Sequence, residues 1–286
     1  MQSRSAHARG TAACGIDTGS LVRALSGRGR AGGVRVRLRA SDAFVPAVLV
    51  HGVPDTHRLW APLRARLRRA DVVAPSLPGF GCALPAGFDA TKEAYVDWLV
   101  REVERAGAPV DLVGHDWGAI LVQRAVSLRP DLVRTWACGS GPIDAGYVWH
   151  DLAQQWQTAG VGEQVMEAIT PEAMAEALAA AGVPAEAARE TARHVDAPMK
   201  DCILRLYRSA VRVGAEWQPD LERVTRPALI LWGRNDPYVT PRFGERLAAR
   251  VRGDLVMLEG CGHWWPLQRP AEAAAALERF WARQVA

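Results

Sequence analysis

The sequence lacks the features that mark a membrane or secreted protein. It has no run of 18 consecutive apolar residues, and its basic start has no apolar segment of the kind found in signal peptides. It also lacks C-x-x-C spacing and has an odd number of cysteines, which argues against a disulfide framework and against a zinc site: Cys14, Cys82, Cys138, Cys202 and Cys261. These absences predict a cytoplasmic protein with reduced cysteines, no metal, no cofactor and no membrane contact.

Net charge is nearly absent outside the first residues. The chain of 286 residues is 49% hydrophobic and 23% charged, a composition that can bury a large core. Residues 1–33 carry five arginines and one acidic residue, Asp17, and so account for the whole formal charge of +4. The rest is neutral overall and does not predict a nucleic-acid partner. We interpret 1–33 as a loose basic extension whose deletion should leave folding and activity nearly intact.

From residue 34 onward, short apolar runs alternate with helix-like stretches. Seven runs have the composition of buried parallel strands: 34–40, 46–52, 70–76, 110–114, 133–139, 227–233 and 254–260. Candidate helices lie between them, at 91–107, 117–130, 241–251 and 270–285. This alternation predicts an α/β fold with a mostly parallel central sheet and helices on both faces.

One long stretch, residues 143–223, has several helix-like segments and no strand-like run. A helical insertion between two strands of a parallel sheet is most simply a cap over the ligand end of that sheet. We therefore divide the chain into a core, residues 34–142 and 224–286, and a helical cap (lid), residues 143–223. The sequence leaves the oligomeric state open between monomer and homodimer.

A charged residue stands where the strand at 110–114 meets the next helix. The junction, Gly114-His115-Asp116-Trp117-Gly118, is a G-x-S-x-G elbow with aspartate in place of serine. Such an elbow holds its central side chain on a strained corner at the carboxyl edge of the sheet, where the glycines allow close backbone approach. Asp116 is therefore a candidate nucleophile, and the alternative is an N-cap of the following helix.

Two more polar residues follow the carboxyl ends of other strands. Asp236 comes after the strand at 227–233, and His263 comes after the strand at 254–260. The order Asp116, Asp236, His263 is the nucleophile, acid, histidine order of the α/β-hydrolase fold. We expect Asp236 to orient His263 and His263 to act as a general base.

The segment His51-Gly52-Val53-Pro54 ends another strand, where this fold donates one backbone N–H to an oxyanion hole. The second donor is the residue after the nucleophile, so the hole is assigned to Val53 and Trp117. His51 is interpreted as a brace for its loop rather than a base, and the same interpretation is given to His115.

With these motifs, residues 34–286 resemble the α/β-hydrolases that have an aspartate nucleophile, the epoxide hydrolases and haloalkane dehalogenases. The motifs are HGVPD, SLPGFG, GHDWGA, WGRNDPYV and GCGHWWP. The resemblance implies that Asp116 attacks a substrate carbon to form an alkyl-enzyme ester, which water activated by His263 then cleaves. An ionised carboxylate attacks without a base, unlike a serine hydroxyl, so the histidine is needed only for the second step.

The cap distinguishes the two subfamilies by how the leaving group is stabilised. Epoxide hydrolases typically protonate the ring oxygen with two lid tyrosines, and Tyr207, in LRLYRSAV, resembles one of them. Gln155 stands about where the resemblance places the other tyrosine. Tyr147 lies eight residues earlier and is a candidate to reach the site, with packing as the alternative.

Haloalkane dehalogenases instead hold the departing halide with two N–H donors. Trp117 fits the first donor, although Val53 occupies the position where one dehalogenase class has asparagine. Trp149 or Trp156 of the cap could supply the second donor.

The leading hypothesis is an epoxide hydrolase-like enzyme that converts a small apolar epoxide and water to a diol. Haloalkane dehalogenase is the alternative, and a non-catalytic ligand-binding protein on the same fold is the second alternative.

Overall fold

A parallel sheet organises the chain. The computed structural model describes residues 14–15 and 45–284. Within them, strands pair in the order β2-β1-β3-β4-β5-β6, and every pairing is parallel. The strands are β1 (Ala47–Val50), β2 (Val72–Val73), β3 (Val110–His115), β4 (Val133–Gly139), β5 (Ala228–Gly233) and β6 (Asp254–Leu258). The predicted fold class is confirmed, and the strand predicted at 34–40 falls outside the described residues.

Successive side chains of the strands point to opposite faces of the sheet and pack into two separate hydrophobic cores. Val48 and Val50 of β1 pack into one core, while Ala47 and Leu49 pack into the other. The first core contains side chains of α3 (Lys92–Ala106), α4 (Trp117–Leu128) and α11 (Pro241–Val251). The second contains side chains of η1 (His57–Trp60), α2 (Ala61–Arg64), α12 (Trp265–Gln268) and α13 (Pro270–Ala282). Because both faces are covered, β1, β2 and β5 are apolar throughout and buried, whereas β3 and β4 also carry polar residues.

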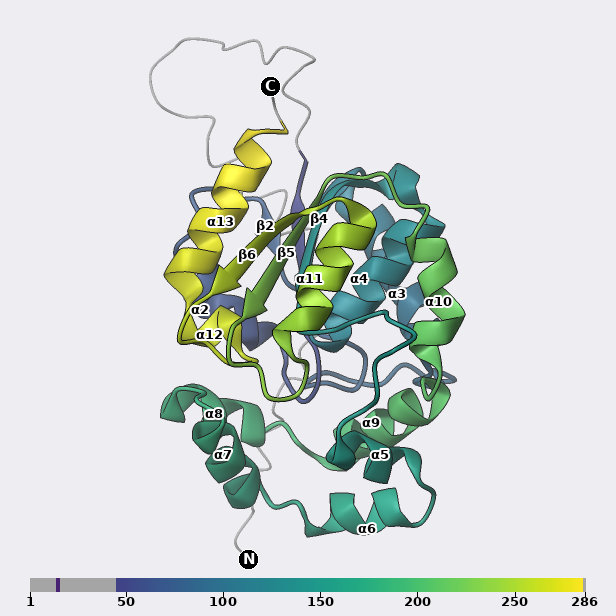
Figure 1. Cartoon of the computed structure of the whole chain (residues 1–286). Coiled ribbons are helices and arrows are strands. Elements are labelled where there is room, and N and C mark those ends of the chain that lie inside the picture. Colours follow the sequence, from purple (N-terminus) through teal and green to yellow (C-terminus); the bar gives the residue numbers. More distant parts are fainter. Residues whose placement is uncertain (1–13, 16–44, 285–286) are drawn as a thin grey trace, which may run out of the picture.

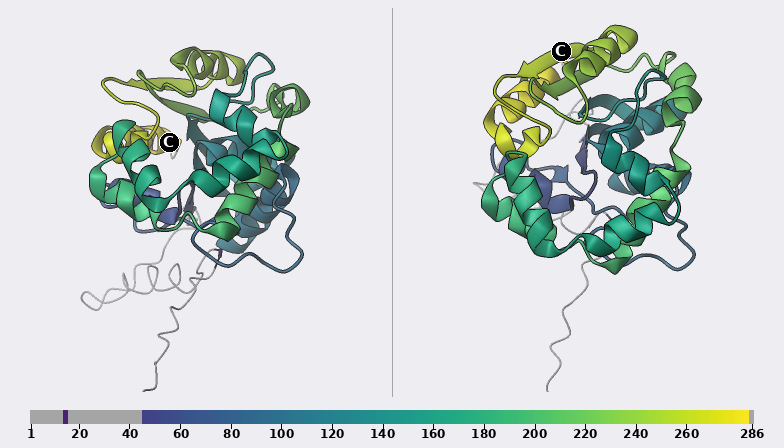
Figure 2. Two further views of the ribbon diagram at one scale, coloured as in Figure 1. Left: turned by 90° about the horizontal axis from the view of Figure 1, so that it is seen from below. Right: turned by 60° about the horizontal axis from the view of Figure 1, so that its bottom comes forward.

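The short helix η2 (Pro130–Leu132) leads from α4 into β4, and a helical segment, called the cap below, follows β4. It comprises α5 (Asp151–Gln157), α6 (Val161–Ala168), α7 (Pro171–Ala180), α8 (Ala185–Ala192), α9 (Ala197–Ser209) and α10 (Val213–Leu221). Helices α5 to α9 lie across the carboxyl end of the sheet, with α7 and α8 packed as a hairpin (Figures 1 and 2). Helix α10 instead packs on α4 of the core.

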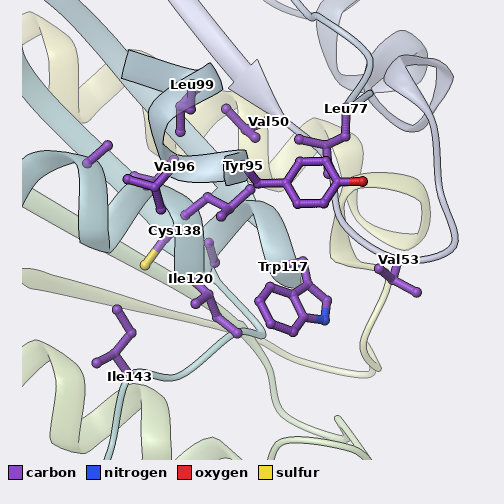
Figure 3. Close-up of a cluster of buried hydrophobic side chains, with 14 of the residues drawn as sticks. Val50, Val53, Leu77, Tyr95, Val96, Leu99, Trp117, Ile120, Cys138 and Ile143 are labelled. Carbon is purple, nitrogen blue, oxygen red and sulfur yellow. The ribbon is translucent and has the colours of Figure 1, made fainter. Parts of the chain in front are cut away.

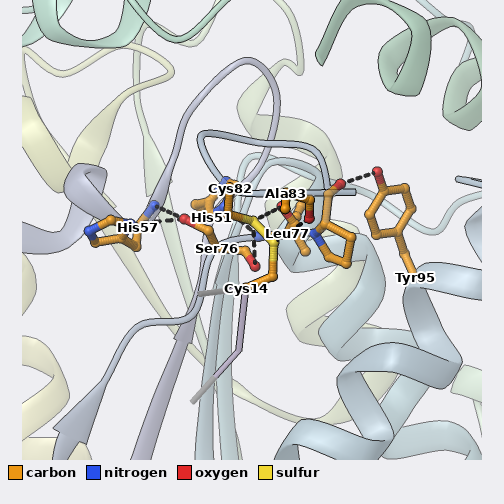
Figure 4. Close-up of a disulfide and its surroundings, with 9 residues drawn as sticks. Cys14, His51, His57, Ser76, Leu77, Cys82, Ala83 and Tyr95 are labelled. Atoms are coloured by element: carbon orange, nitrogen blue, oxygen red, sulfur yellow. Dashed lines mark hydrogen bonds between the residues drawn. A yellow bond between two sulfur atoms is a disulfide. The ribbon is translucent and has the colours of Figure 1, made fainter. Parts of the chain in front are cut away.

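A disulfide corrects the prediction of reduced cysteines. Cys14 forms a disulfide with Cys82, which lies in the loop that follows β2 (Figure 4). The two cysteines are 68 residues apart in the sequence. Cys138, Cys202 and Cys261 are free and buried. The prediction failed because it rested on sequence spacing, whereas a disulfide requires only that two side chains meet in space. Cys14 belongs to the predicted loose extension, so the extension is covalently tied to the core there, and deletion of residues 1–33 would remove this bond. Apart from Cys14 and Gly15, residues 1–33 lie outside the described residues.

Within the described ranges, no helix combines the length and the apolar character needed to cross a membrane.

Candidate active site

Asp116 stands on a strained elbow between β3 and α4. Its φ is 54°, an uncommon value for a residue other than glycine, and its N–H donates to the Gly139 carbonyl at 3.1 Å. A Cβ added to Gly118 would lie 2.0 Å from the Val50 carbonyl oxygen, so only glycine fits there. Asp116 occupies the N-cap position of α4, but its side chain makes no capping hydrogen bond to the helix.

Backbone from the loop after β1 lies against the Asp116 carboxylate. The Val53 N–H donates to Asp116 Oδ1 at 2.7 Å. A Cβ on Gly52 would lie 2.1 Å from the same oxygen and 2.6 Å from the Trp117 amide nitrogen. Both predicted oxyanion-hole amides, those of Val53 and Trp117, are therefore beside the carboxylate.

His51 braces this loop, as the sequence indicates. Its Nδ1 lies 2.9 Å from the Gly52 carbonyl oxygen, and the Leu77 N–H donates to its Nε2 at 2.9 Å. Burial lowers the pKa of His51 to about 3, so the ring is neutral and donates through Nδ1. His57, by contrast, contacts the Ser76 hydroxyl at 2.8 Å and does not line the cavity described below (Figure 4).

His263 lies between two carboxylates. Its Nδ1 is 2.9 Å from Asp236 Oδ2, and its Nε2 is 3.5 Å from Asp116 Oδ2. Burial alone would lower the pKa of His263, but the charge of Asp236 and the bonds to both carboxylates outweigh burial and raise it to about 10. The two carboxylates therefore favour a protonated imidazole in the resting site.

The surroundings fix this histidine and its partner. Burial favours the neutral form of Asp236, yet the His263 charge and hydrogen bonds prevail and lower the Asp236 pKa. Asp236 Oδ1 also accepts the N–H groups of Tyr238 and Val239, at 2.9 and 3.0 Å. His115 lies with Nε2 2.9 Å from the His263 carbonyl oxygen and thereby supports the loop.

A cavity of about 440 Å³ opens between the core and the cap, with Asp116 and His263 on its wall. None of the described residues that line it is lysine or arginine. Aromatic side chains form one part of the wall: Tyr147, Trp149, His150, Trp156, Tyr207, Tyr238 and Trp264. Aliphatic side chains of α6, α7 and their connection form another: Val165, Ala168, Ile169, Ala173, Met174, Ala177 and Leu178. Such a cavity suits an uncharged, apolar molecule.

Both cap tyrosines singled out from the sequence line this cavity. Tyr207 is buried, and burial followed by the Asp116 charge raises its pKa well above the usual value, against a smaller opposing effect of the Trp117 indole. Burial and the charges of Asp116 and Asp236 likewise raise the pKa of Tyr147, whose hydroxyl donates to the Tyr238 carbonyl at 3.3 Å. Both phenols are therefore protonated donors at neutral pH.

Two other predicted binding residues lie away from the cavity wall. Trp117 is fully buried beneath it among apolar side chains (Figure 3). Its ring is stacked on Trp149 at 5.7 Å and lies edge-on to Tyr207 at 5.2 Å. Gln155 is exposed on α5, whereas its neighbour Trp156 is buried and lines the cavity. The expectation that Gln155 contacts substrate is not met, because one step along a helix turns a side chain by about 100°.

Sequence reasoning missed His150, Tyr238 and Trp264 as lining residues. His150 Nδ1 accepts the Ala153 N–H at 3.3 Å and caps α5, so its proton is on Nε2. Tyr238 and Trp264 adjoin the predicted Asp236 and His263 within two residues, and this proximity was the available signal. Within the described ranges, no group of three or more histidine, cysteine or acidic side chains is placed to hold a metal ion.

A parallel sheet, an elbow at its carboxyl edge, a histidine paired with a carboxylate and a helical cap together define the capped α/β-fold hydrolases. The model of the alpha/beta hydrolase family matches residues 47–277, and the chain belongs to this family.

Characterised relatives cover most of the chain at low identity. Epoxide hydrolase A of Mycobacterium tuberculosis is 25% identical over 304 residues, covering 86% of this chain and 94% of the relative. The (E)-2-((N-methylformamido)methylene)succinate hydrolase of Acinetobacter baylyi is 23% identical, covering 82% and 89%. Haloalkane dehalogenase DbeA of Bradyrhizobium elkani superposes with a TM-score of 0.68 at 21% identity, covering 85% and 92%. The structural likeness shows a shared fold.

Proposed function

We propose that the protein hydrolyses an epoxide on an uncharged, apolar molecule to a diol, through an ester formed on Asp116. One observation carries the proposal: the Asp116 carboxylate and the phenols of Tyr147 and Tyr207 share one cavity. A carboxylate supplies the nucleophile, and a phenol can protonate the ring oxygen as the carbon–oxygen bond breaks. The absence of lysine and arginine from the described lining favours a substrate without an anionic group.

In the first step, Asp116 attacks a ring carbon and its negative charge is lost as the ester forms. The ring oxygen takes up a proton from a tyrosine. His263 can then return a proton to that tyrosine, because the resting imidazole is protonated. Loss of the Asp116 charge also removes one of the interactions that raise the pKa of His263. Alkylation therefore converts His263 from an ion-pair partner into a base.

In the second step, neutral His263 takes a proton from water, and the water oxygen attacks the ester carbonyl carbon of Asp116. The Val53 and Trp117 amides stabilise the oxyanion that develops. Collapse of this intermediate breaks the acyl–oxygen bond, and the proton of the attacking hydroxyl passes to the leaving alkoxide. The diol is thereby released, and Asp116 returns as a carboxylate beside protonated His263. The protons balance over the cycle, and the net reaction is the addition of one water to the epoxide.

A second candidate, haloalkane dehalogenation, rests on two indole groups. Trp117 Nε1 and Trp156 Nε1 are buried and have no aligned acceptor among the described residues. Trp156 lines the cavity, so its N–H could hold a halide there, whereas Trp117 lies beneath the cavity wall. Trp149 Nε1, in contrast, donates to the Ala210 carbonyl at 3.3 Å. Haloalkanes therefore belong beside epoxides in any substrate panel.

The covalent step can be tested by blocking the second step. His263→Gln should react once with an epoxide that the wild-type protein turns over and then stop, because no base remains to activate water. Mass spectrometry should find the substrate mass on the peptide that contains Asp116. Asp116→Asn is the matched control and should show no early adduct, since an amide is a poor nucleophile.

The opposite pattern would refute this route. A His263→Gln protein that binds substrate yet stays unmodified, together with residual turnover in Asp116→Asn, indicates direct attack by water. The wild-type protein should be assayed for diol formation from epoxides and for halide release from bromoalkanes. Comparison of the two rates distinguishes the two leaving groups.

A further inference from the structure

Asp55 is a buried carboxyl group that the proposed reaction does not use. It is 1% exposed and lies two residues after Val53, in the same loop that reaches the Asp116 carboxylate. Its own N–H donates to the Gly52 carbonyl at 3.0 Å, which closes the turn between them. A carboxyl group taken out of water costs free energy unless its oxygens are hydrogen-bonded.

The two oxygens of Asp55 bind two different parts of the molecule. Oδ2 accepts the Trp264 indole N–H at 3.0 Å, from the loop that carries His263. Oδ1 accepts the Thr191 hydroxyl at 3.2 Å, from α8 of the cap. These contacts are separated by 209 and 136 residues in the sequence. One side chain of the loop after β1 therefore connects the histidine loop and the cap.

The Trp264 contact bears directly on the site. The Trp264 ring lies 4.9 Å from the His263 ring, nearly perpendicular to it, and 5.8 Å from the Tyr238 ring. Trp264 also lines the cavity. An indole that turned away would free one side of His263 and change the shape of the cavity wall.

We propose that Asp55 is a positioning residue, which holds Trp264 against His263 and anchors the α7–α8 hairpin of the cap over the cavity. The inference rests on the proposed function in that it assigns His263 as the base. A misplacement of about 1 Å at a reacting group can cost on the order of 10²-fold in rate, so such a residue affects catalysis without touching substrate.

Charge is a second way in which Asp55 acts on the site. Burial raises the pKa of Asp55 to about 7; the Asp116 charge acts in the same direction, and the Trp264 and Thr191 hydrogen bonds and His263 oppose it. The neighbouring charged groups pair with one another: Glu190 of α8 lies 3.1 Å from Arg58 and also pairs with Arg193 and His194. Ionised Asp55 in turn favours protonated His263.

Three variants separate these roles. Asp55→Ala removes both hydrogen bonds, Asp55→Asn keeps the shape without the charge, and Thr191→Val removes only the contact with the cap. Arg58→Ala is the matched control, because it cuts an exposed contact between the same region and α8 and leaves Trp264 alone. Hydrogen exchange of residues 185–192 and 262–268 measures the anchoring without any substrate.

We expect Asp55→Ala to speed exchange in both segments and to lower kcat/KM by roughly tenfold to 10²-fold. Thr191→Val should speed exchange in 185–192 alone, and Arg58→Ala should match the wild-type protein in both segments. Asp55→Asn should recover most of the lost rate and move the acidic limb of the kcat profile to lower pH, because neutral His263 then persists to lower pH.

Unchanged exchange in Asp55→Ala, or in Thr191→Val if the alanine variant does not fold, overturns the anchoring. A wild-type pH profile in Asp55→Asn, together with loss of stability but not of rate in Asp55→Ala, would reduce Asp55 to a structural residue. Failure of the proposed function looks different: the wild-type protein itself would turn over no epoxide, whatever the exchange of its variants.

Discussion

At the scale of single residues, the Tyr207 phenol is the group that distinguishes the two candidate reactions. It lines the cavity and packs edge-on against Trp156 at 4.9 Å and Trp117 at 5.2 Å. A phenol can give up a proton to a ring oxygen, whereas a halide needs only N–H donors. The two proposed reactions thus make different demands on this cluster, and single substitutions within it test which one the protein catalyses.

Tyr207→Phe should lower epoxide turnover by about 10²-fold or more, the usual contribution of a general acid. Haloalkane turnover, if present, should be affected by Trp156→Phe instead. Steady-state rates on matched epoxides and bromoalkanes measure both. Tyr95→Phe is the control, because its hydroxyl is also buried but donates to the Pro78 carbonyl away from the cavity. Full epoxide turnover in Tyr207→Phe would leave the ring oxygen without the acid assigned here.

Helices α5 and α7 form the rim of the cavity at the scale of the element. Ala173 and Ala177 of α7, and Leu152 of α5, line the cavity and are also exposed. Residues four positions apart share one face of a helix, so the two alanines present a shallow wall to an approaching molecule. We infer that their small size keeps this side open.

Ala177→Trp should lower kcat/KM for a long-chain terminal epoxide severalfold more than for a short one, because the added ring narrows the rim. The position is exposed, so thermal stability should change little. Ala179→Trp is the matched control, since Ala179 is exposed on the same helix but does not line the cavity. Equal losses for long and short substrates would mean that access runs elsewhere.

Helices and strands whose apolar residues recur at regular intervals could be predicted from the sequence. Contacts between residues far apart in the sequence could not. Helix α11 matches the predicted 241–251 because Pro241 begins it and an apolar face continues to Val251. The elbow at Asp116 was recognised because its glycines are imposed by backbone contact. The Asp55 contact with Trp264 spans 209 residues and leaves no local pattern. The orientation of Gln155 and Trp156 depends on how α5 packs, which only the folded structure fixes.

The Cys14–Cys82 bond affects the stability of the whole molecule. It closes a loop of 68 residues that includes β1 and β2. Such a crosslink restricts the unfolded chain, and loop-closure entropy assigns it about 4 kcal/mol. Cys82 also contacts the Leu77 carbonyl at 3.3 Å, and Leu77 in turn holds His51 (Figure 4).

Reduction should therefore lower the free energy of unfolding by up to about 4 kcal/mol. Urea unfolding with and without reductant measures the difference. Cys82→Ser should reproduce the loss and should not respond further to reductant, because the other described cysteines are free thiols. Identical curves for oxidised and reduced protein would show that the bond does not form in solution.

The apolar lining also affects what leaves the cavity. In the proposed reaction, the diol carries two hydroxyl groups where the epoxide carried one ether oxygen. The aliphatic wall of α6 and α7 offers them no hydrogen bonds from its side chains. Water therefore competes for the product better than for the substrate, which favours release. Each methylene added to the hydrocarbon tail of the diol stabilises the bound product by about 0.8 kcal/mol, which lowers its dissociation constant roughly fourfold. Inhibition by product should thus be weak for short diols and grow with the length of the hydrocarbon tail.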